Sequence, residues 1–253
     1  MKGSLYISDT NSHQSPFASY HIYQRSIDKR VIFHNSYDAL VLLTIISIRA
    51  KIDNIKIFAL CFMSNHIHLL VKAKQKETIH KFVNEYTSFF SRFYNKEHER
   101  KGPLISRPFG RALKYTDKYI RNCISYICNN PVEARICKKI EQYTWNFVSY
   151  FKSSHPFSQK IDLSTSRNRL RISIRQIKSL YSKGKNLNYT LLRNLFSEIN
   201  KEEALQLKDY IIKTYNPVDY QAVISLFGNW DQAILAINSY TGSEYDIKED
   251  DRI

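Results

Sequence analysis

The pattern of apolar and polar residues predicts alternating strands and helices over the first 150 positions. Residues 20–24 and 66–72 have the composition and alternation of half-buried strands, and residues 55–62 form a strongly apolar strand. Only residues 63–65 separate the last two segments, so we expect an antiparallel hairpin. Between residues 79 and 94, apolar side chains recur three and four positions apart, which indicates a helix.

Capping residues and prolines set the limits of the other elements. Ser36 suits the N-cap of a helix that runs to about Ala50, and Thr116 suits the N-cap of a later helix. That later helix is expected to end near Asn130, because Pro131 disfavours helical geometry in the residue before it. A short strand is expected within residues 107–114. The order β-α-β-β-α-β-α predicts an α+β fold in which helices cover one side of an antiparallel sheet.

The remainder of the chain has a different pattern. Residues 153–169 are rich in Ser, Lys and Arg, as in a linker. Four helical segments are expected after it, near residues 171–183, 190–197, 201–215 and 217–240. We therefore predict an α+β domain over residues 1–155 and a helical C-terminal region over residues 156–253.

The net charge of the chain is +15, from 38 Lys and Arg against 23 Asp and Glu. Residues 161–193 hold 8 basic and 1 acidic side chains, whereas residues 194–253 hold 5 basic and 11 acidic ones. A polyanionic partner fits this charge, because each phosphate neutralised by Lys or Arg releases counterions. A basic protein that uses its charge only for solubility fits it as well.

Cysteine usage and hydropathy bear on the compartment. The four cysteines form no CxxC pair and no zinc-finger spacing, which fits a reduced, cytoplasmic setting. The N-terminus has no signal-peptide pattern, and the longest apolar run, residues 39–48, is too short to span a bilayer. We expect a protein that is neither secreted nor embedded in a membrane.

His66 and His68 are the first candidates for chemistry. Residues two apart on a strand point to the same face, about 7 Å apart at Cα, so both imidazoles can converge on one ion. The alternative is two histidines on the open face of an amphipathic strand. Such pairs are common by chance, so the spacing alone does not decide between the two.

Tyr126 and Asn130 favour the metal site. They stand four positions apart on the predicted helix, so their side chains lie one above the other. The amide oxygen of Asn130 can be a third ligand, and this set suits Mg²⁺ or Mn²⁺ better than structural Zn²⁺. Tyr126 is then a nucleophile that attacks phosphorus and leaves a 5′-phosphotyrosine. As one of 18 tyrosines it also fits a core aromatic; Tyr119, on the same helix, has only Cys123 four positions on, a poor partner for a hard metal.

Several segments of residues 20–150 resemble the single-tyrosine HUH transposases, and among them the REP-associated tyrosine transposases. The matching segments are YHIYQR at 20–25, CFMSNHIHLLV at 61–71, GPL at 102–104, RPF at 107–109 and YICNNPVEA at 126–134. The chain departs from the family pattern at Ser64, where proline is usual, at Arg135, where glycine is usual, and after Trp145, where paired serines are usual. None of these departures removes a catalytic atom.

The resemblance implies a ferredoxin-like antiparallel sheet and transposition through single-stranded DNA, often with recognition of a DNA hairpin. It implies that His66 and His68 are metal ligands, Asn130 the third ligand and Tyr126 the nucleophile. The expected activity is therefore metal-dependent cleavage and rejoining of single-stranded DNA, by a monomer or a homodimer. Two alternatives remain: a replication-initiator or relaxase-type nickase with the same chemistry, and a domesticated nucleic-acid-binding protein without catalysis.

Basic residues near aromatic ones are candidates for contact with DNA, because they pair with phosphates while aromatic rings stack on unpaired bases. One set lies within the strand candidate at 107–114, and a second follows the linker. The candidates are Arg107, Arg111 and Lys114, then Arg167, Arg169, Arg171 and Arg175. For the second set, a solvated linker and helix face is an equally good interpretation.

Overall fold

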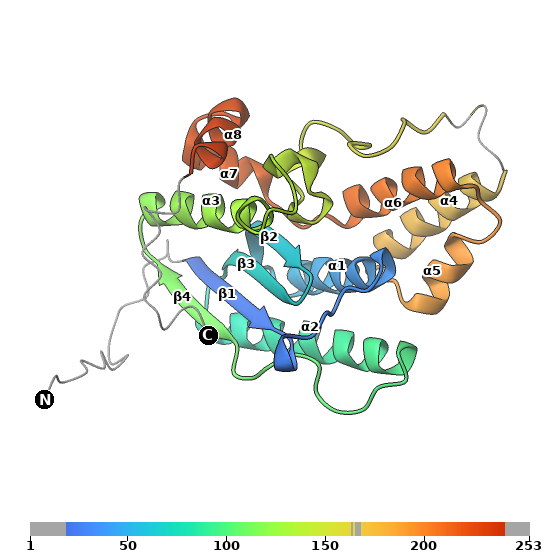
Figure 1. The fold of residues 1–253 in the computed structure, drawn as a ribbon, viewed down its shortest axis with the longest axis horizontal. Helices are drawn as coiled ribbons and strands as arrows, with labels where there is room; N and C mark the ends of the chain where they lie inside the picture. Colours follow the sequence, from blue (N-terminus) through green and yellow to red (C-terminus); the bar gives the residue numbers. More distant parts are fainter. Residues whose placement is uncertain (1–18, 163, 165–167, 241–253) are drawn as a thin grey trace, which may run out of the picture.

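The computed structural model describes residues 19–162, 164 and 168–240, and it is built on a four-stranded antiparallel sheet (Figure 1). Its strands are β1 (Ser19–Arg25), β2 (Lys56–Met63), β3 (His66–Lys72) and β4 (Gly110–Lys114). They are arranged in the order β2-β3-β1-β4, with every neighbouring pair antiparallel. Helix α1 (Ser36–Ile52) connects β1 to β2, and α2 (Lys76–Glu97) connects β3 to β4. This is the ferredoxin-like βαββαβ arrangement, so the predicted fold class is confirmed.

Helices cover both faces of the sheet, so the expectation of helices on one side is wrong (Figure 1). Helices α1 and α2 close one face, where Ile22, Ile67 and Leu69 are buried. Helix α3 (Asp117–Glu133) packs on the other face, chiefly over β2. Strand β2 is therefore apolar on both sides, which explains its continuous apolar run. Periodicity shows that a strand has two sides, but it does not show which helix covers which side.

Helix α1 begins one residue away from the predicted cap. Asn35 is its N-cap and accepts hydrogen bonds from the backbone N–H groups of Tyr37 and Asp38. The Asp38 carboxylate accepts in turn from the N–H of Asn35, which completes a capping box. Ser36 is thus the first helical residue.

Helix α3 begins as predicted but ends later. Thr116 is its N-cap, and its hydroxyl accepts from the backbone N–H of Tyr119. The helix continues through Pro131 to Glu133, so the expected end near Asn130 is wrong. Proline in the last turn removes a single backbone donor. Arg135, just beyond the helix, has a φ of 56°, the left-handed conformation that the glycine usual in the resembling family adopts more readily.

The C-terminal part is helical, as expected, after three short 3₁₀ turns. The turns are η2 (Ile140–Gln142), η3 (Thr144–Asn146) and η4 (Val148–Tyr150), and a further one, η1 (Ile27–Lys29), follows β1. The helices are α4 (Asn168–Ser182), α5 (Tyr189–Leu195), α6 (Lys201–Tyr215), α7 (Tyr220–Phe227) and α8 (Trp230–Asn238). The bounds of α6 were predicted correctly. The segment predicted as one helix over 217–240 contains two, because Gly228, with a φ of 93°, ends α7.

The C-terminal helices share a core with the sheet. Every residue of α1 from Asp38 to Ile48 is buried, since α2 covers one side of that helix and α5 and α6 cover another. Buried Asp209 of α6 accepts a hydrogen bond from the hydroxyl of Tyr150 at 2.7 Å. The predicted boundary at residue 155 lies between η4 and α4 and stays a prediction. None of the helices in the described part of the chain is long and apolar enough to cross a membrane.

Candidate metal and nucleophile site

The pairing of β1 with β3 brings polar residues together on the α3 side of the sheet. In this pairing Tyr23 is opposite His68, and Arg25 is opposite His66. Residues opposite each other in an antiparallel pair share a face, and Ile22, Ile67 and Leu69 point the other way. The ring centroids of His66 and His68 are 5.0 Å apart, so the two imidazoles are neighbours, as their spacing predicts.

The hydrogen bonds of the two histidines leave one nitrogen of each ring for a ligand. The Nδ1 of His68 is 3.0 Å from the Nε2 of His21, and the buried Nε2 of His68 has no hydrogen-bond partner among the described residues. The Nδ1 of His66 donates to the Oδ1 of Asn65 at 2.7 Å, so its Nε2 is the nitrogen that faces the Asn130 side chain. A metal-bound histidine is usually held in this way, with its second nitrogen bound to a neighbouring group.

The three histidines are neutral at pH 7. Burial, with a smaller contribution from Arg25, lowers the pKa of His66 to about 4, while hydrogen bonding to Asn130 opposes the shift. Burial also holds the pKa of His68 well below its ordinary value, helped by the neighbouring His21. Burial and Lys114 lower the pKa of His21 to about 3. Neutral imidazole is the form that binds a metal ion.

Helix α3 places Tyr126 and Asn130 over the histidines. The ring centroid of Tyr126 is 5.5 Å from that of His68 and 5.8 Å from that of His21. The Asn130 amide nitrogen donates to the carbonyl of Tyr126 at 2.9 Å, which directs the amide along the helix. Burial, and then Glu133, raise the pKa of Tyr126 to about 12. The phenol is therefore protonated at neutral pH and needs activation before it can attack phosphorus.

The residues present fit a hard divalent ion. Within the described ranges, no three His, Cys, Asp or Glu side chains converge in a way that could hold a metal. A site here therefore needs an oxygen ligand of another kind, and the amide of Asn130 lies close enough to His66 and His68 to affect the pKa of both. The buried Nε2 of His68, which has no partner, is the clearest sign of a missing ligand.

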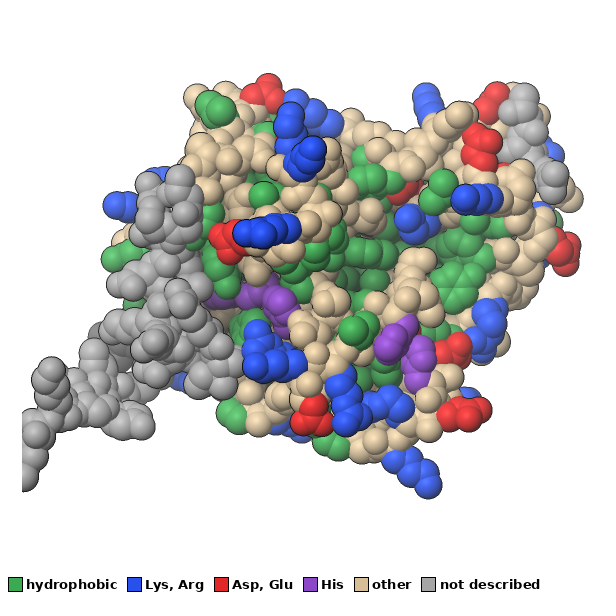
Figure 2. Space-filling view, viewed as in Figure 1, with side chains coloured by type: hydrophobic (Ala, Val, Ile, Leu, Met, Phe, Trp, Pro, Cys, Tyr) green, Lys and Arg blue, Asp and Glu red, His purple; other side chains and the backbone are tan. Residues whose placement is uncertain are grey.

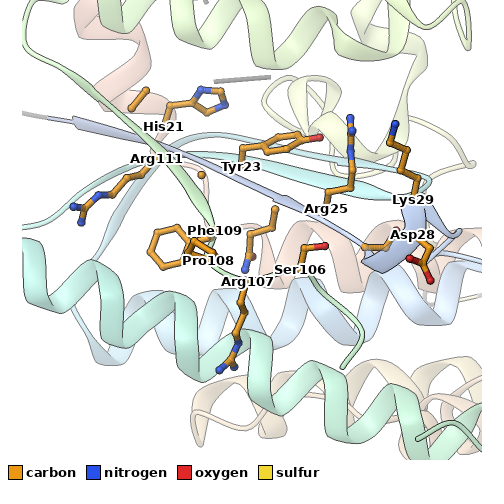
Figure 3. Close-up of a pocket in the computed structure, with 14 residues that line it drawn as sticks. His21, Tyr23, Arg25, Asp28, Lys29, Ser106, Arg107, Pro108, Phe109 and Arg111 are labelled. Carbon is orange, nitrogen blue, oxygen red and sulfur yellow. The ribbon is translucent and has the colours of Figure 1, made fainter. Parts of the chain in front are cut away.

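The predicted DNA-binding residues of β4 divide between the two faces of the sheet. Lys114 is opposite Ser19 and lies on the histidine side, where it lowers the pKa of His21. Arg111 contacts His80 of α2, and Arg107 donates to Ser88 of α2 at 3.4 Å. Figure 3 shows Arg107 and Arg111 projecting from the opposite side of the strands to His21, Tyr23 and Arg25. The structure therefore brings only Lys114 to the site.

The predicted contacts after the linker lie away from the histidines. Arg169 of α4 donates to Asn194 at 2.8 Å and Ser197 at 2.7 Å, so it links α4 to the end of α5. Arg171 and Arg175 are on the same helix. Helix α1 lies between this helix and strands β1 and β4 (Figure 1). Arg167 lies outside the described residues. A role for these four in DNA binding stays a prediction.

Sequence reasoning assigned no role to three residues of β1 that line the site: His21, Tyr23 and Arg25. They occupy alternate positions of the strand, which is the signal that could have grouped them. That they face His66 and His68 depends on β1 pairing with β3, which the sequence does not show. In the view of Figure 2, histidine side chains are visible at the surface in more than one place, beside Lys and Arg side chains.

Comparisons with known proteins give a family match over part of the chain and a similar solved structure. Residues 15–130 match the family model described as Transposase IS200 like. Among curated proteins, none matches the chain. Among solved structures, the chain is similar to a REP-associated tyrosine transposase bound to a REP hairpin, with a TM-score of 0.44 and 12% sequence identity over 56% of this chain and 82% of that chain. A likeness at this level assigns no role to any residue.

Proposed function

We propose that this protein is a transposase of the IS200-like family, whose model matches residues 15–130, and that it cleaves and rejoins single-stranded DNA at specific sites through a 5′-phosphotyrosine on Tyr126. The observation that carries the proposal is the position of this phenol beside His68, whose buried Nε2 lacks a partner. The proposed DNA partner is a hairpin or palindrome, as the sequence resemblance implies. The net charge of +15 favours such a polyanion.

The proposed reaction is a displacement at phosphorus. The Tyr126 oxygen forms a bond to phosphorus, the bond from phosphorus to the 3′ oxygen breaks, and the phenol proton leaves as the 3′ oxygen gains one. Attack by the released 3′-OH on the phosphotyrosine reverses the step, and attack by another 3′-OH joins a new end. Two displacements in sequence therefore conserve the number of phosphodiester bonds.

His66, His68 and Asn130 would hold a divalent ion, proposed to be Mg²⁺ or Mn²⁺. When bound, such an ion supplies polarisation of the scissile phosphate and compensation of the charge that develops on it. His21 holds His68 in the orientation that leaves Nε2 free for the ion. Helix α3 fixes Tyr126 one turn before Asn130, so nucleophile and ligand move as one body.

The test is formation of a covalent adduct. The protein is incubated with labelled single-stranded DNA from the palindromes that flank its own gene, with Mg²⁺ or Mn²⁺, and the products are separated by denaturing electrophoresis. We expect an adduct with the wild-type protein and none with Tyr126→Phe, while the variant keeps its affinity for DNA. EDTA should abolish the adduct.

Tyr119→Phe is the matched control. Tyr119 lies on the same helix two turns before Tyr126 and is 57% exposed, so its hydroxyl is available to solvent and to DNA. We expect full adduct formation by this variant. An adduct that persists in Tyr126→Phe and disappears in Tyr119→Phe would move the nucleophile to Tyr119. Binding without an adduct under all conditions would support the non-catalytic alternative.

A further inference from the structure

Arg25 and Tyr23 lie beside the proposed ligands without being needed to hold the ion. Arg25 is the last residue of β1 and is opposite His66, while Tyr23 is opposite His68. The Arg25 guanidinium carbon is 5.4 Å from the centroid of the Tyr23 ring. The two side chains rise from the same side of β1 as His21 (Figure 3). A cation and a phenol are thus placed next to the two imidazoles.

Buried polar atoms of these residues lack a hydrogen-bond partner among the described residues. The Nε of Arg25 and the hydroxyl of Tyr23 are buried without a partner at hydrogen-bond geometry, although Arg25 is close enough to oppose the rise that burial causes in the pKa of Tyr23. The buried Nε2 of His68 also lacks a partner. Buried donors in proteins are nearly always satisfied, so unsatisfied ones that gather at one place indicate a ligand. Both Nε–H and the phenol O–H donate, which suits an oxyanion.

An open cleft leads to these two residues. It has a volume of about 570 Å³ and lies between β1 and the segment at 106–112. Gly110 and Ala112 are opposite Tyr23 and His21 in β4, so the strand contributes little side-chain volume on this face. Lys29 also lines the cleft and adds positive charge, while Asp28 at the same cleft is paired with Arg30. A single strand of DNA can therefore approach Arg25 from the open side, whereas α3 covers the β2 side.

We propose that Arg25 and Tyr23 form a binding site for the scissile phosphodiester, in which the Arg25 guanidinium pairs with a non-bridging oxygen and the Tyr23 hydroxyl donates to the same phosphate. This inference rests on the proposed function. A guanidinium beside the reacting phosphate stabilises the extra negative charge of the pentacoordinate state. It also holds the phosphate next to His68, whose ring contacts both Tyr23 and Tyr126.

The test compares Arg25→Gln with the wild type on two substrates: a phosphodiester oligonucleotide and one with an uncharged methylphosphonate at the scissile position. Single-turnover cleavage of the phosphodiester by Arg25→Gln is expected to fall by about 100-fold, as when one preorganised donor is lost. On the methylphosphonate, the two proteins should cleave at rates within about threefold of each other, because the charge that Arg25 pairs with is absent. Tyr23→Phe should give a smaller loss on the phosphodiester, about tenfold, as expected for one neutral hydrogen bond.

Arg30→Gln is the matched control, since Arg30 is exposed, close in sequence and paired with Asp28. It should leave both rates unchanged. Equal losses for Arg25→Gln on both substrates would show a merely structural role and overturn the inference, as would full activity on the phosphodiester. Melting temperatures of the variants check that the fold is retained.

A binding measurement separates this inference from the proposed function. A short single-stranded oligonucleotide and its fully methylphosphonate counterpart are titrated with wild type and Arg25→Gln. We expect Arg25→Gln to weaken binding of the first by about tenfold and to leave binding of the second unchanged. If the wild type forms no adduct but this pattern holds, the proposed function fails and the phosphate site stands. If adducts form and the pattern is absent, the phosphate site fails.

Discussion

The two faces of the central sheet are made by the same strands and serve opposite purposes. In β3, Ile67 and Leu69 point toward α1 and α2 and are fully buried among apolar side chains. His66 and His68 alternate with them and point to the side of α3, where polar atoms are left without partners. The first face gains stability by excluding water. The second carries the cost of unsatisfied polar groups, which is typical of a site that gains its partners only when ligands bind.

The difference shows that stability and chemistry are separated by a single residue step along a strand. A one-residue shift of β3 against β1 would exchange the two sets of side chains. The apolar set therefore fixes the register that aligns Arg25 with His66 and Tyr23 with His68. Substitutions at Ile67 and Leu69 should change stability alone, whereas substitutions at His66 and His68 should change activity far more than stability. The first two predictions below test whether this separation holds.

The largest effect is expected from replacing both His66 and His68 with alanine. Loss of two ligands should reduce the adduct below detection. The protein should still fold, with some loss of melting temperature because the buried His68 ring leaves a cavity beside Tyr23 and Tyr126. The measurement is single-turnover cleavage over a range of Mg²⁺ concentrations, with thermal unfolding beside it. Cleavage that continues in EDTA would rule out the metal site. If Zn²⁺ alone restores cleavage by the wild type, the choice of Mg²⁺ or Mn²⁺ is wrong and the site itself stands.

On the apolar face, Leu69→Ala should have the reverse effect. Deleting a fully buried leucine side chain costs about 2–5 kcal/mol of unfolding free energy, through lost burial and the cavity left behind. Leu69→Met, which conserves volume, should cost less than about 1.5 kcal/mol. Denaturant unfolding gives both values, and the cleavage rate per folded molecule should equal that of the wild type. A slower rate in the folded fraction would show that the two faces are coupled.

A smaller change is expected from His21→Phe, which removes the partner of His68 and keeps a ring of similar shape. Losing a group that orients a ligand typically weakens metal binding by about 10–100-fold. The Mg²⁺ concentration for half-maximal cleavage should rise by that factor, and high Mg²⁺ should restore the rate. His80→Phe, on the α2 side against Phe109, is the control and should leave the Mg²⁺ requirement unchanged. An unchanged requirement in His21→Phe would mean that His68 is held by its packing alone.

Local features of the fold could be predicted from the sequence because they depend on local interactions. Alternation gave the bounds of β3 without error, and the spacing of His66 and His68 placed both on one face. The Thr116 cap was also recognisable, since a hydroxyl before a helix accepts from the first turn.

Features that depend on tertiary packing could not be predicted in the same way. The helix of Tyr126 was expected on the side that α1 and α2 occupy, and it lies on the other. No periodicity indicates that β1 separates β3 from β4, and so His21, Tyr23 and Arg25 were not assigned to the site. The complete burial of α1 between Asp38 and Ile48 could not be predicted either. It depends on α5 and α6, which come from the C-terminal part of the chain and cover the side of α1 that α2 leaves open.

The smallest effect expected concerns the two basic residues of β4 that lie on different faces. Lys114 shares the histidine face, whereas Arg111 lies toward α2 beside His80. If DNA occupies the histidine face, Lys114→Ala should lower the slope of log affinity against log salt by about one phosphate contact, slightly less than one unit. Arg111→Ala should leave the slope within error. Binding is measured at several salt concentrations in a Tyr126→Phe background, so that cleavage does not disturb the equilibrium. Equal losses for both variants would mean that DNA wraps around the edge strand and contacts both faces, and a loss for Arg111→Ala alone would place the DNA along α2, away from the histidines.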